Sequence, residues 1–504
     1  MFRRLILATL FAAGAAHAEL PEPVAALLQT KHIPQDAIGV VVMQGDAAIV
    51  SHNANLSMQP ASTMKLFTTM TGLEQLGPIF RGRTELRSSA SVVKGVLQGD
   101  LYLRGGADVD FNEDVLAHML QELRNQGIDT IQGDIVLDRE LFQPARPDSN
   151  APPFDEYPWA YYNVIPDALL INTNLLKIEL RSADGKLALA MMPAMDDVAI
   201  ASDMKLTDAA CASWQNTWRA PDVLSQDGKL TVQLHGSFPR NCTAAISVNA
   251  LDRHDYLARL MLATWKRLGG KLNGVVREAG AIPAAVATAT TIATTTAATA
   301  AATPPNARLL ADHVSRALPE VLRDINKQSD NVLARTLFLS LGSLEADPLL
   351  GSHPITLSSG ETTASHADLV IRAWLLRHNI NDQGLVLENG SGLSRLERAT
   401  ASQMAGVLQA GLHSQWMPEF LSSLPIAATD GTMRRRLKDS PAAAHARLKT
   451  GSLKGVIAVA GYVPDANGQL CVVVAMINHE QVANGAGSAV LDSLIDWVSR
   501  YRIP

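Results

Sequence analysis

The stretch Pro60-Ala61-Ser62-Thr63-Met64-Lys65 begins a predicted helix, and it decides how the rest of the chain is interpreted. Proline suits the first turn of a helix, and Gly77 marks the end of this one. Ser62 and Lys65 are three positions apart, so a helix brings the amine close to the hydroxyl. A helix N-terminus favours negative charge on the serine oxygen, and a neutral amine activates a serine hydroxyl as a nucleophile.

The Ser-x-x-Lys spacing alone is weak evidence, because the sequence contains it three times. Ser91–Lys94 and Ser202–Lys205 repeat it in polar, strand-like or loop sequence with no helix behind them. For any single occurrence, a surface serine near a lysine is the simpler interpretation. Other motifs must therefore single out Ser62.

Two further strings do so, since Ser329-Asp330-Asn331 and Lys449-Thr450-Gly451 each occur once. The looser Ser-x-Asn pattern also occurs at residues 51–53 and 247–249, where a turn or a helix cap explains it. Lys449-Thr450-Gly451 stands directly before a predicted strand hairpin. In this order the three strings form the motif set of penicillin-binding proteins and serine β-lactamases.

Predicted strands stand at both ends of the chain. Residues 37–43 and 47–50 form one hairpin, and residues 456–463 and 469–474 form another around an Asn-Gly turn. Helical periodicity occupies much of the sequence before the second hairpin, at residues 307–317, 320–340, 364–378 and 401–412, and residues 487–500 form a closing helix. We expect the two ends to share one sheet, with a β-rich middle inserted as separate modules.

The cysteines predict one disulfide candidate. Cys211 and Cys242 flank one segment of the β-rich middle, and they can pair in an oxidising compartment. Cys471 lies in an apolar run typical of a buried strand, where a thiol is inert. The sequence has no Cys-x-x-Cys and no His-Glu-x-x-His, so we expect no metal site and no cofactor.

Residues 1–18 have the pattern of a secretory signal peptide: Arg3 and Arg4, a short apolar run, and Ala16-His17-Ala18 before Glu19. No later run of 18 apolar residues follows, so we expect at most peripheral contact with a membrane. The formal net charge of −6 gives no basic nucleic-acid footprint. An Ala/Thr tract at residues 284–303 predicts an exposed linker or loop, with a marginal helix as the alternative.

The motifs and their surroundings resemble the D-alanyl-D-alanine carboxypeptidase/endopeptidase family typified by penicillin-binding protein 4 (peptidase family S13). Ser329 lies 267 positions after Ser62, a gap similar to this family's and too long for a simple β-lactamase. Asn389 departs from the aspartate usual in the family, and we expect a modest structural change there. The resemblance also covers residues 60–65, 99–103, 325–331, 390–395, 429–433 and 449–453.

This resemblance implies an α/β (α+β) penicillin-binding, β-lactamase-like transpeptidase fold: an antiparallel sheet flanked by helices, with two inserted β-rich domains. The catalytic domain would comprise residues 19–82 and 306–504. Inserted domain II would comprise residues 83–165 and 250–305, and inserted domain III residues 166–249.

The resemblance also implies a periplasmic serine-type D-Ala-D-Ala carboxypeptidase or endopeptidase that acts on peptidoglycan muropeptides and is inhibited by β-lactams. It does not decide whether the protein is a monomer or a homodimer. We expect burial and the nearby charge of Lys449 to lower the pKa of Lys65, and the backbone N–H groups of Ser62 and Ser452 to form an oxyanion hole. A serine β-lactamase and a catalytically silent cell-wall-binding protein are the competing interpretations. The implied catalytic residues are Ser62, Lys65, Ser329, Asn331 and Lys449, and the implied substrate-binding residues are Asp330, Thr450, Gly451 and Ser452.

Overall fold

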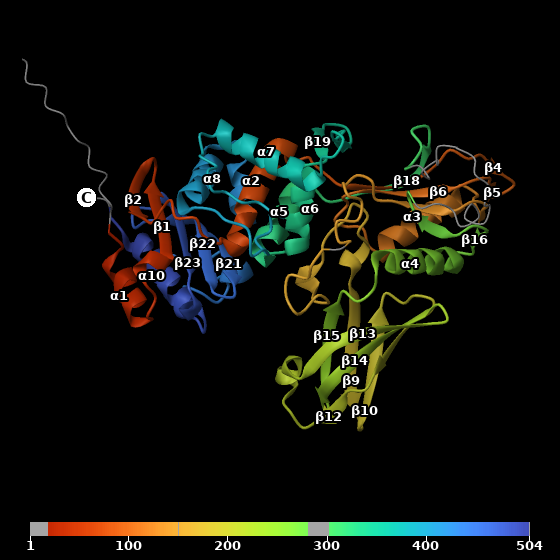
Figure 1. The fold of residues 1–504 in the computed structure, drawn as a ribbon, viewed down its shortest axis with the longest axis horizontal. Coiled ribbons are helices and arrows are strands. Elements are labelled where there is room, and N and C mark those ends of the chain that lie inside the picture. The colour runs from red at the N-terminus through yellow and green to blue at the C-terminus, as the bar shows by residue number, and fades with distance from the viewer. Residues whose placement is uncertain (1–18, 150, 281–301, 503–504) are drawn as a thin grey trace, which may run out of the picture.

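The computed structural model describes residues 19–149, 151–280 and 302–502. The expected signal peptide and nearly all of the Ala/Thr tract lie outside the described residues. The first and last parts of the chain form one body, and the middle part extends away from it as two β-rich modules (Figure 1). In the described ranges, every helix is too short or too polar to cross a membrane.

An antiparallel five-stranded sheet combines the two ends of the chain, as the sequence predicted. Its order is β2 (Ala47–His52), β1 (Ile38–Gln44), β23 (Leu470–Asn478), β22 (Val456–Pro464) and β21 (Arg447–Leu453). The three inner strands are almost continuously buried, because helices cover both faces of the sheet. The edge strand β21 carries the Lys-Thr-Gly motif.

Two layers of helices enclose this sheet. Helices α1 (Glu22–Thr30) and α10 (Ala486–Arg500) pack on one face, and α2 (Lys65–Leu76) and α8 (Ala401–His413) lie on the other. Every residue of α2 except Glu74 and Gln75 is buried, so Lys65 begins a helix that is shielded from solvent along most of its length. The helices that surround α2 directly or through its neighbours are α5 (Leu318–Arg323), α6 (Asn331–Leu341), α7 (Thr363–Arg377) and α9 (Met417–Ser423).

The first inserted module contains a mixed five-stranded sheet with α3 (Glu113–Asn125) and α4 (Arg253–Arg267) packed into its core. The strand order is β17 (Val276–Glu278), β8 (Ile135–Asp138), β6 (Leu101–Gly106), β3 (Arg83–Ser88) and β18 (Arg308–Val314). A small second sheet has the order β16 (Lys271–Leu272), β7 (Thr130–Ile131), β5 (Val96–Leu97) and β4 (Val92–Val93).

Strand β18 corrects one prediction from the sequence. Residues 307–317 were expected to be helical, yet Arg308–Val314 pair with β3 in the inserted module. Pairing with a distant strand overrides the local helical preference of these residues. The inserted sheet therefore continues past residue 305, where the sequence placed the end of domain II.

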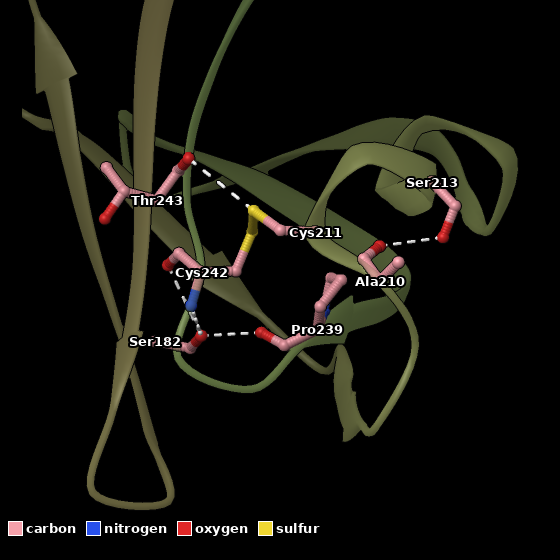
Figure 2. Close-up of a disulfide and its surroundings, with 7 residues drawn as sticks. All are labelled: Ser182, Ala210, Cys211, Ser213, Pro239, Cys242 and Thr243. Atoms are coloured by element: carbon pink, nitrogen blue, oxygen red, sulfur yellow. Dashed lines mark hydrogen bonds between the residues drawn. A yellow bond between two sulfur atoms is a disulfide. The ribbon is translucent and has the colours of Figure 1, made fainter.

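The second inserted module is built from short sheets joined by a disulfide. One sheet has the order β10 (Lys186–Met192), β9 (Leu176–Ala183) and β15 (Thr243–Val248). In the other, β14 (Lys229–Pro239) pairs with β11 (Val198–Ser202), β12 (Lys205–Thr207) and β13 (Trp218–Gln226). Cys211 and Cys242 are bonded, with their Cα atoms 5.5 Å apart (Figure 2).

A buried charge cluster joins the first inserted module to the segment that leads into the second. Asp167 is fully buried, and its carboxylate accepts from Arg139 at 2.8 Å and from Arg253 at 2.7 Å. Both arginine side chains are almost fully buried as well. A charge inside a protein is tolerated when it is paired, so each member of this cluster depends on the others.

Candidate active site

The turn that carries Ser62 has a constrained backbone. A short 3-10 helix, Ala61–Met64, leads into α2, and Ala61 has a left-handed φ of +47°. This conformation is uncommon for a residue with a side chain and marks a site held by its surroundings. Gly392 and Gly451 are those surroundings: a Cβ on Gly451 would lie 2.7 Å from the Pro60 oxygen, and one on Gly392 would collide with the carbonyl of Ala61.

Lys65 places its amine against the nucleophile. Its Nζ donates to Ser62 Oγ at 3.1 Å, to Asn331 Oδ1 at 2.7 Å and to the Ser391 carbonyl at 2.5 Å. Burial lowers the pKa of Lys65 to about 7. The carboxylates of Asp330 and Glu397 oppose this shift, whereas the positive charge of Arg335 adds to it.

The second motif interrupts a helix that the sequence predicted as continuous over residues 320–340. After α5, residues Asp324–Gln328 form a π-helical turn, and Ser329 then adopts a left-handed φ of +60°. Helix α6 begins at Asn331. At this position, the first of the helix, the Asn331 side chain reaches Lys65. Asp330, which the resemblance assigned to substrate binding, caps α6 by accepting from Leu333 N at 2.9 Å.

The third motif lies on β21, alongside the Ser62 turn. Lys449 is buried, and its Nζ donates to Ser329 Oγ at 2.9 Å and to the Thr450 carbonyl at 2.7 Å. Burial, with the positive charge of Lys65, lowers the pKa of Lys449 well below its usual value. Thr450 is partly exposed and Ser452 is exposed, while Gly451 is buried against Pro60 and Ser62.

A loop that the sequence did not assign to the site completes the surroundings of Lys65. The carboxylate of Glu397 accepts from four backbone N–H groups, of Glu388, Asn389, Gly390 and Gly392, at 2.8–3.2 Å. Burial raises the pKa of Glu397, while these backbone donors oppose the increase. The result is a fixed loop whose Ser391 carbonyl points at the Lys65 amine.

Asn389, which replaces the usual aspartate, stabilises the same loop. Its Oδ1 accepts from the N–H of Ser391 at 3.0 Å and from the Ser391 hydroxyl at 2.6 Å. Its Nδ2 donates to the Leu393 carbonyl at 3.1 Å, a bond that needs an amide rather than a carboxylate. The three bonds of Asn389 therefore all lie within this loop.

The inserted sequence contributes one wall of the site. Asn331 Nδ2 donates to the Tyr162 carbonyl at 3.3 Å, and Arg335 Nη1, one turn later on α6, donates to the Val164 carbonyl at 3.2 Å. Only 7% of Arg335 is exposed, and its guanidinium also donates to the Leu393 carbonyl at 3.4 Å. A cavity of about 850 Å³ lies beside this wall, and its lining does not include Ser62.

The structure thus brings together the five predicted catalytic side chains, although their motifs are more than a hundred residues apart in the sequence. The other two Ser-x-x-Lys strings stay outside this constellation: Ser91–Lys94 flanks β4, and Ser202–Lys205 joins the end of β11 to β12. Sequence reasoning missed Glu397, Arg335 and the Ser391 carbonyl. Among the residues that the structure describes, no three His, Cys, Asp or Glu side chains form a group able to hold a metal ion.

Comparison with known proteins shows which proteins this chain resembles along its length. A sequence model of the D-Ala-D-Ala carboxypeptidase 3 (S13) family matches residues 20–501. The D-alanyl-D-alanine carboxypeptidase of Actinomadura sp. (strain R39) is 28% identical over 507 residues, which cover 97% of this chain and 86% of that protein. The D-alanyl-D-alanine carboxypeptidase DacB of Haemophilus influenzae is 27% identical over 441 residues, which cover 85% of this chain and 82% of that protein.

The fold also matches a solved structure. The crystal structure of penicillin binding protein 4 from Haemophilus influenzae superposes with a TM-score of 0.72 at 24% identity, covering 95% of this chain and 99% of that one. This match confirms the fold class expected from the sequence. The family match confirms the resemblance drawn from the three motifs.

Proposed function

This chain belongs to the D-Ala-D-Ala carboxypeptidase 3 (S13) family, and we propose that it is a serine-type D-Ala-D-Ala carboxypeptidase and endopeptidase acting on peptidoglycan peptides. The observation that carries the proposal is the contact of a buried Lys65 amine with Ser62 Oγ at 3.1 Å. Two curated relatives along most of the chain bear the name D-alanyl-D-alanine carboxypeptidase.

Acylation begins with the transfer of a proton from Ser62 Oγ to the neutral Lys65 amine. A lysine with a pKa of about 7 is roughly half neutral at pH 7, whereas an unperturbed lysine is almost wholly charged. The serine oxygen attacks the carbonyl carbon of the D-alanyl bond and forms a tetrahedral oxyanion. The backbone N–H groups of Ser62 and Ser452 stabilise this oxyanion, because the first begins a helix and the second lies on the adjacent edge strand.

The tetrahedral intermediate collapses when the leaving amine receives a proton. Lys65 gives up the proton that it took from Ser62, and Ser329 Oγ, which accepts from Lys449 Nζ at 2.9 Å, relays a proton to the leaving amine. The C–N bond breaks, which leaves an ester on Ser62 and a neutral Lys65. Lys449, Thr450 and Ser452 hold the terminal carboxylate of the substrate, and Asn331 orients Lys65. Water then hydrolyses the ester. A β-lactam mimics the substrate, and its reaction with Ser62 stops at the ester, so the β-lactam inhibits the enzyme.

Intact-protein mass spectrometry after incubation with benzylpenicillin tests this assignment. We expect one covalent adduct on the wild type and on Ser91→Ala, a matched control in a second Ser-x-x-Lys string. We expect no adduct on Ser62→Ala. An unmodified wild type, or an adduct that survives Ser62→Ala, would overturn the assignment.

Two activity assays separate the competing interpretations. Rapid turnover of a chromogenic cephalosporin would favour a β-lactamase, and folded protein without any acylation would favour a silent cell-wall-binding protein. Incubation with a monomeric pentapeptide and with a crosslinked muropeptide then measures carboxypeptidase against endopeptidase activity. The proposal predicts release of D-alanine from the pentapeptide and cleavage of the crosslink.

We place the enzyme in the periplasm, with cleavage of the signal peptide before Glu19. The bonded Cys211 and Cys242 suit an oxidising compartment. Mass spectrometry of protein recovered from a periplasmic extract tests this placement. A chain that retains residues 1–18 would contradict it.

A further inference from the structure

We propose that the ion pair between Lys327 and Asp430 is a positioning device that holds Ser329 against Lys449. Among the described residues, neither side chain is hydrogen-bonded to Ser62 or Lys65, and neither lies in the strings of residues 62–65, 329–331 and 449–451, although the family resemblance covers residues 325–331 and 429–433. The inference rests on the proposed function, because it gives these residues a role in the same acylation step.

Lys327 lies two residues before Ser329, inside the π-helical turn Asp324–Gln328. Its side chain is buried, and its Nζ donates to Asp430 Oδ2 at 2.6 Å and to the Leu424 carbonyl at 2.9 Å. The preceding Asn326 donates to Ser423 Oγ at 2.9 Å. Two consecutive side chains therefore attach this turn to the end of α9 and to the segment that follows it.

Asp430 also stabilises the segment that follows α9 through its second carboxylate oxygen. Its second oxygen, Oδ1, accepts from Ile426 N at 2.7 Å and closes the turn of residues 426–430. Gly431 follows with a left-handed φ of +52°, and a Cβ there would lie 2.6 Å from the Lys327 carbonyl. The backbones at Gly431 and Lys327 are thus in direct contact, in addition to the ion pair between Lys327 and Asp430.

The turn of residues 426–430 is in turn attached to the strand that carries Lys449. Leu448 N donates to the Pro425 carbonyl at 2.8 Å, and Ala427 N donates to the Ala446 carbonyl at 3.1 Å. Farther along, the hydroxyls of Thr432 and Thr450 are hydrogen-bonded at 2.7 Å. A continuous path of contacts therefore leads from Ser329 through Lys327 and Asp430 to the backbone of β21.

This path matters because the backbone at Ser329 is not one that the local sequence stabilises. A π-helical turn followed by a left-handed serine is strained and persists only where neighbouring structure holds it. The Ser329–Lys449 hydrogen bond connects two side chains, whereas the Lys327–Asp430 pair connects the segments that carry them. Loss of the pair would let Ser329 move, and a displacement of about 1 Å lowers catalysis by roughly 100-fold.

The test compares Asp430→Asn and Lys327→Met with a matched control, Asp492→Asn. The control breaks the Arg436–Asp492 pair of the same domain, which has the same 2.6 Å separation and similar partial exposure. The readout is the second-order rate constant of acylation by a fluorescent penicillin, with the melting temperature measured in parallel. We expect about 10- to 100-fold slower acylation for the two test variants and less than a twofold change for the control.

A double-mutant comparison separates positioning from general stability. If Lys327 and Asp430 act through Ser329, Ser329→Ala with Asp430→Asn acylates no more slowly than Ser329→Ala alone. Losses that multiply, or an Asp430→Asn variant that acylates at the wild-type rate, would overturn the proposal. Lys327→Arg keeps the charge and gives a folded variant if Lys327→Met does not fold; we expect it to retain most of the rate.

The outcomes also distinguish this inference from the proposed function. A wild type that is not acylated refutes the proposed function. A wild type that is acylated normally, together with test variants that behave like Asp492→Asn, refutes only the positioning role.

Discussion

The pH dependence of acylation follows directly from the environment of Lys65. Only the neutral amine accepts the Ser62 proton, so the rate constant follows the neutral fraction of Lys65. With a pKa of about 7, this fraction falls about 30-fold between pH 8 and pH 5.5. Because burial lowers the pKa of this lysine, activity is gained as the pH rises through 7 and stays nearly constant above pH 8.

The assay is stopped-flow acylation by a fluorescent penicillin from pH 5.5 to 9.5, with circular dichroism as a check that the fold persists. We expect the logarithm of the rate constant to rise with a slope of about one below pH 7. A rate constant that still rises with a slope of about one at pH 9.5, as the unperturbed pKa of about 10.4 would give, or a rate independent of pH, would refute the reasoning.

The variant Arg335→Met adds a second readout. The positive charge of Arg335 helps to lower the pKa of Lys65, so its removal moves the rise in activity to higher pH. A shift to lower pH would contradict this electrostatic role. An unchanged midpoint with a lower plateau would mean that Arg335 acts only through its contacts with Val164 and Leu393.

Three further predictions concern stability and geometry. Replacing both Cys211 and Cys242 by serine opens a loop with a sequence separation of 31 residues and should lower the free energy of unfolding by about 3–4 kcal/mol in urea titrations; a loss below about 1 kcal/mol would contradict the loop-entropy argument. Asp167→Asn leaves two buried arginines undercompensated and should lower the free energy of unfolding by about 3–5 kcal/mol, whereas Asp496→Asn, in a pair with the exposed Arg500, should leave thermal unfolding nearly unchanged. Gly451→Ala places a Cβ 2.7 Å from the Pro60 oxygen and 3.0 Å from Ser62 N, so acylation should fall about 100-fold in a protein that still folds; a wild-type rate would show that the turn can move away.

The sequence predicted the parts of the site that local chemistry dictates. A lysine three residues after a serine at a helix start needs no tertiary information, and the unique Lys449-Thr450-Gly451 string precedes an unmistakable hairpin. The shared sheet was also predictable, because both ends of the chain carry long apolar strand patterns. These signals survive because each depends on residues that are close in the sequence.

The remaining features depend on residues that are close only in space. The Ser391 carbonyl that accepts from Lys65 has no side-chain signature, and Glu397 acts on it through four backbone N–H groups. Position 61 is an alanine and not a glycine, so the sequence gives no sign of its left-handed φ. Strand β18 had a helical pattern, and only its pairing with β3 made it a strand. Asp330 fell inside a catalytic motif, yet it serves as a helix cap.

The order of strands in the central sheet also determines at which stage of synthesis the active site can form. Strand β1 comes from residues 38–44, but one of its two partners, β23, ends at residue 478. In the part of the chain that the structure describes, the strands of the inserted modules pair within residues 83–314, so these modules can fold before the last strands of the central sheet have been synthesised. Ser62 must wait for strand β21 at residues 447–453, which flanks its turn, and for the strands that hold β21 in place. Active-site assembly is therefore postponed until the last strands of the central sheet have been synthesised, and Ser62 lacks its catalytic partners until then.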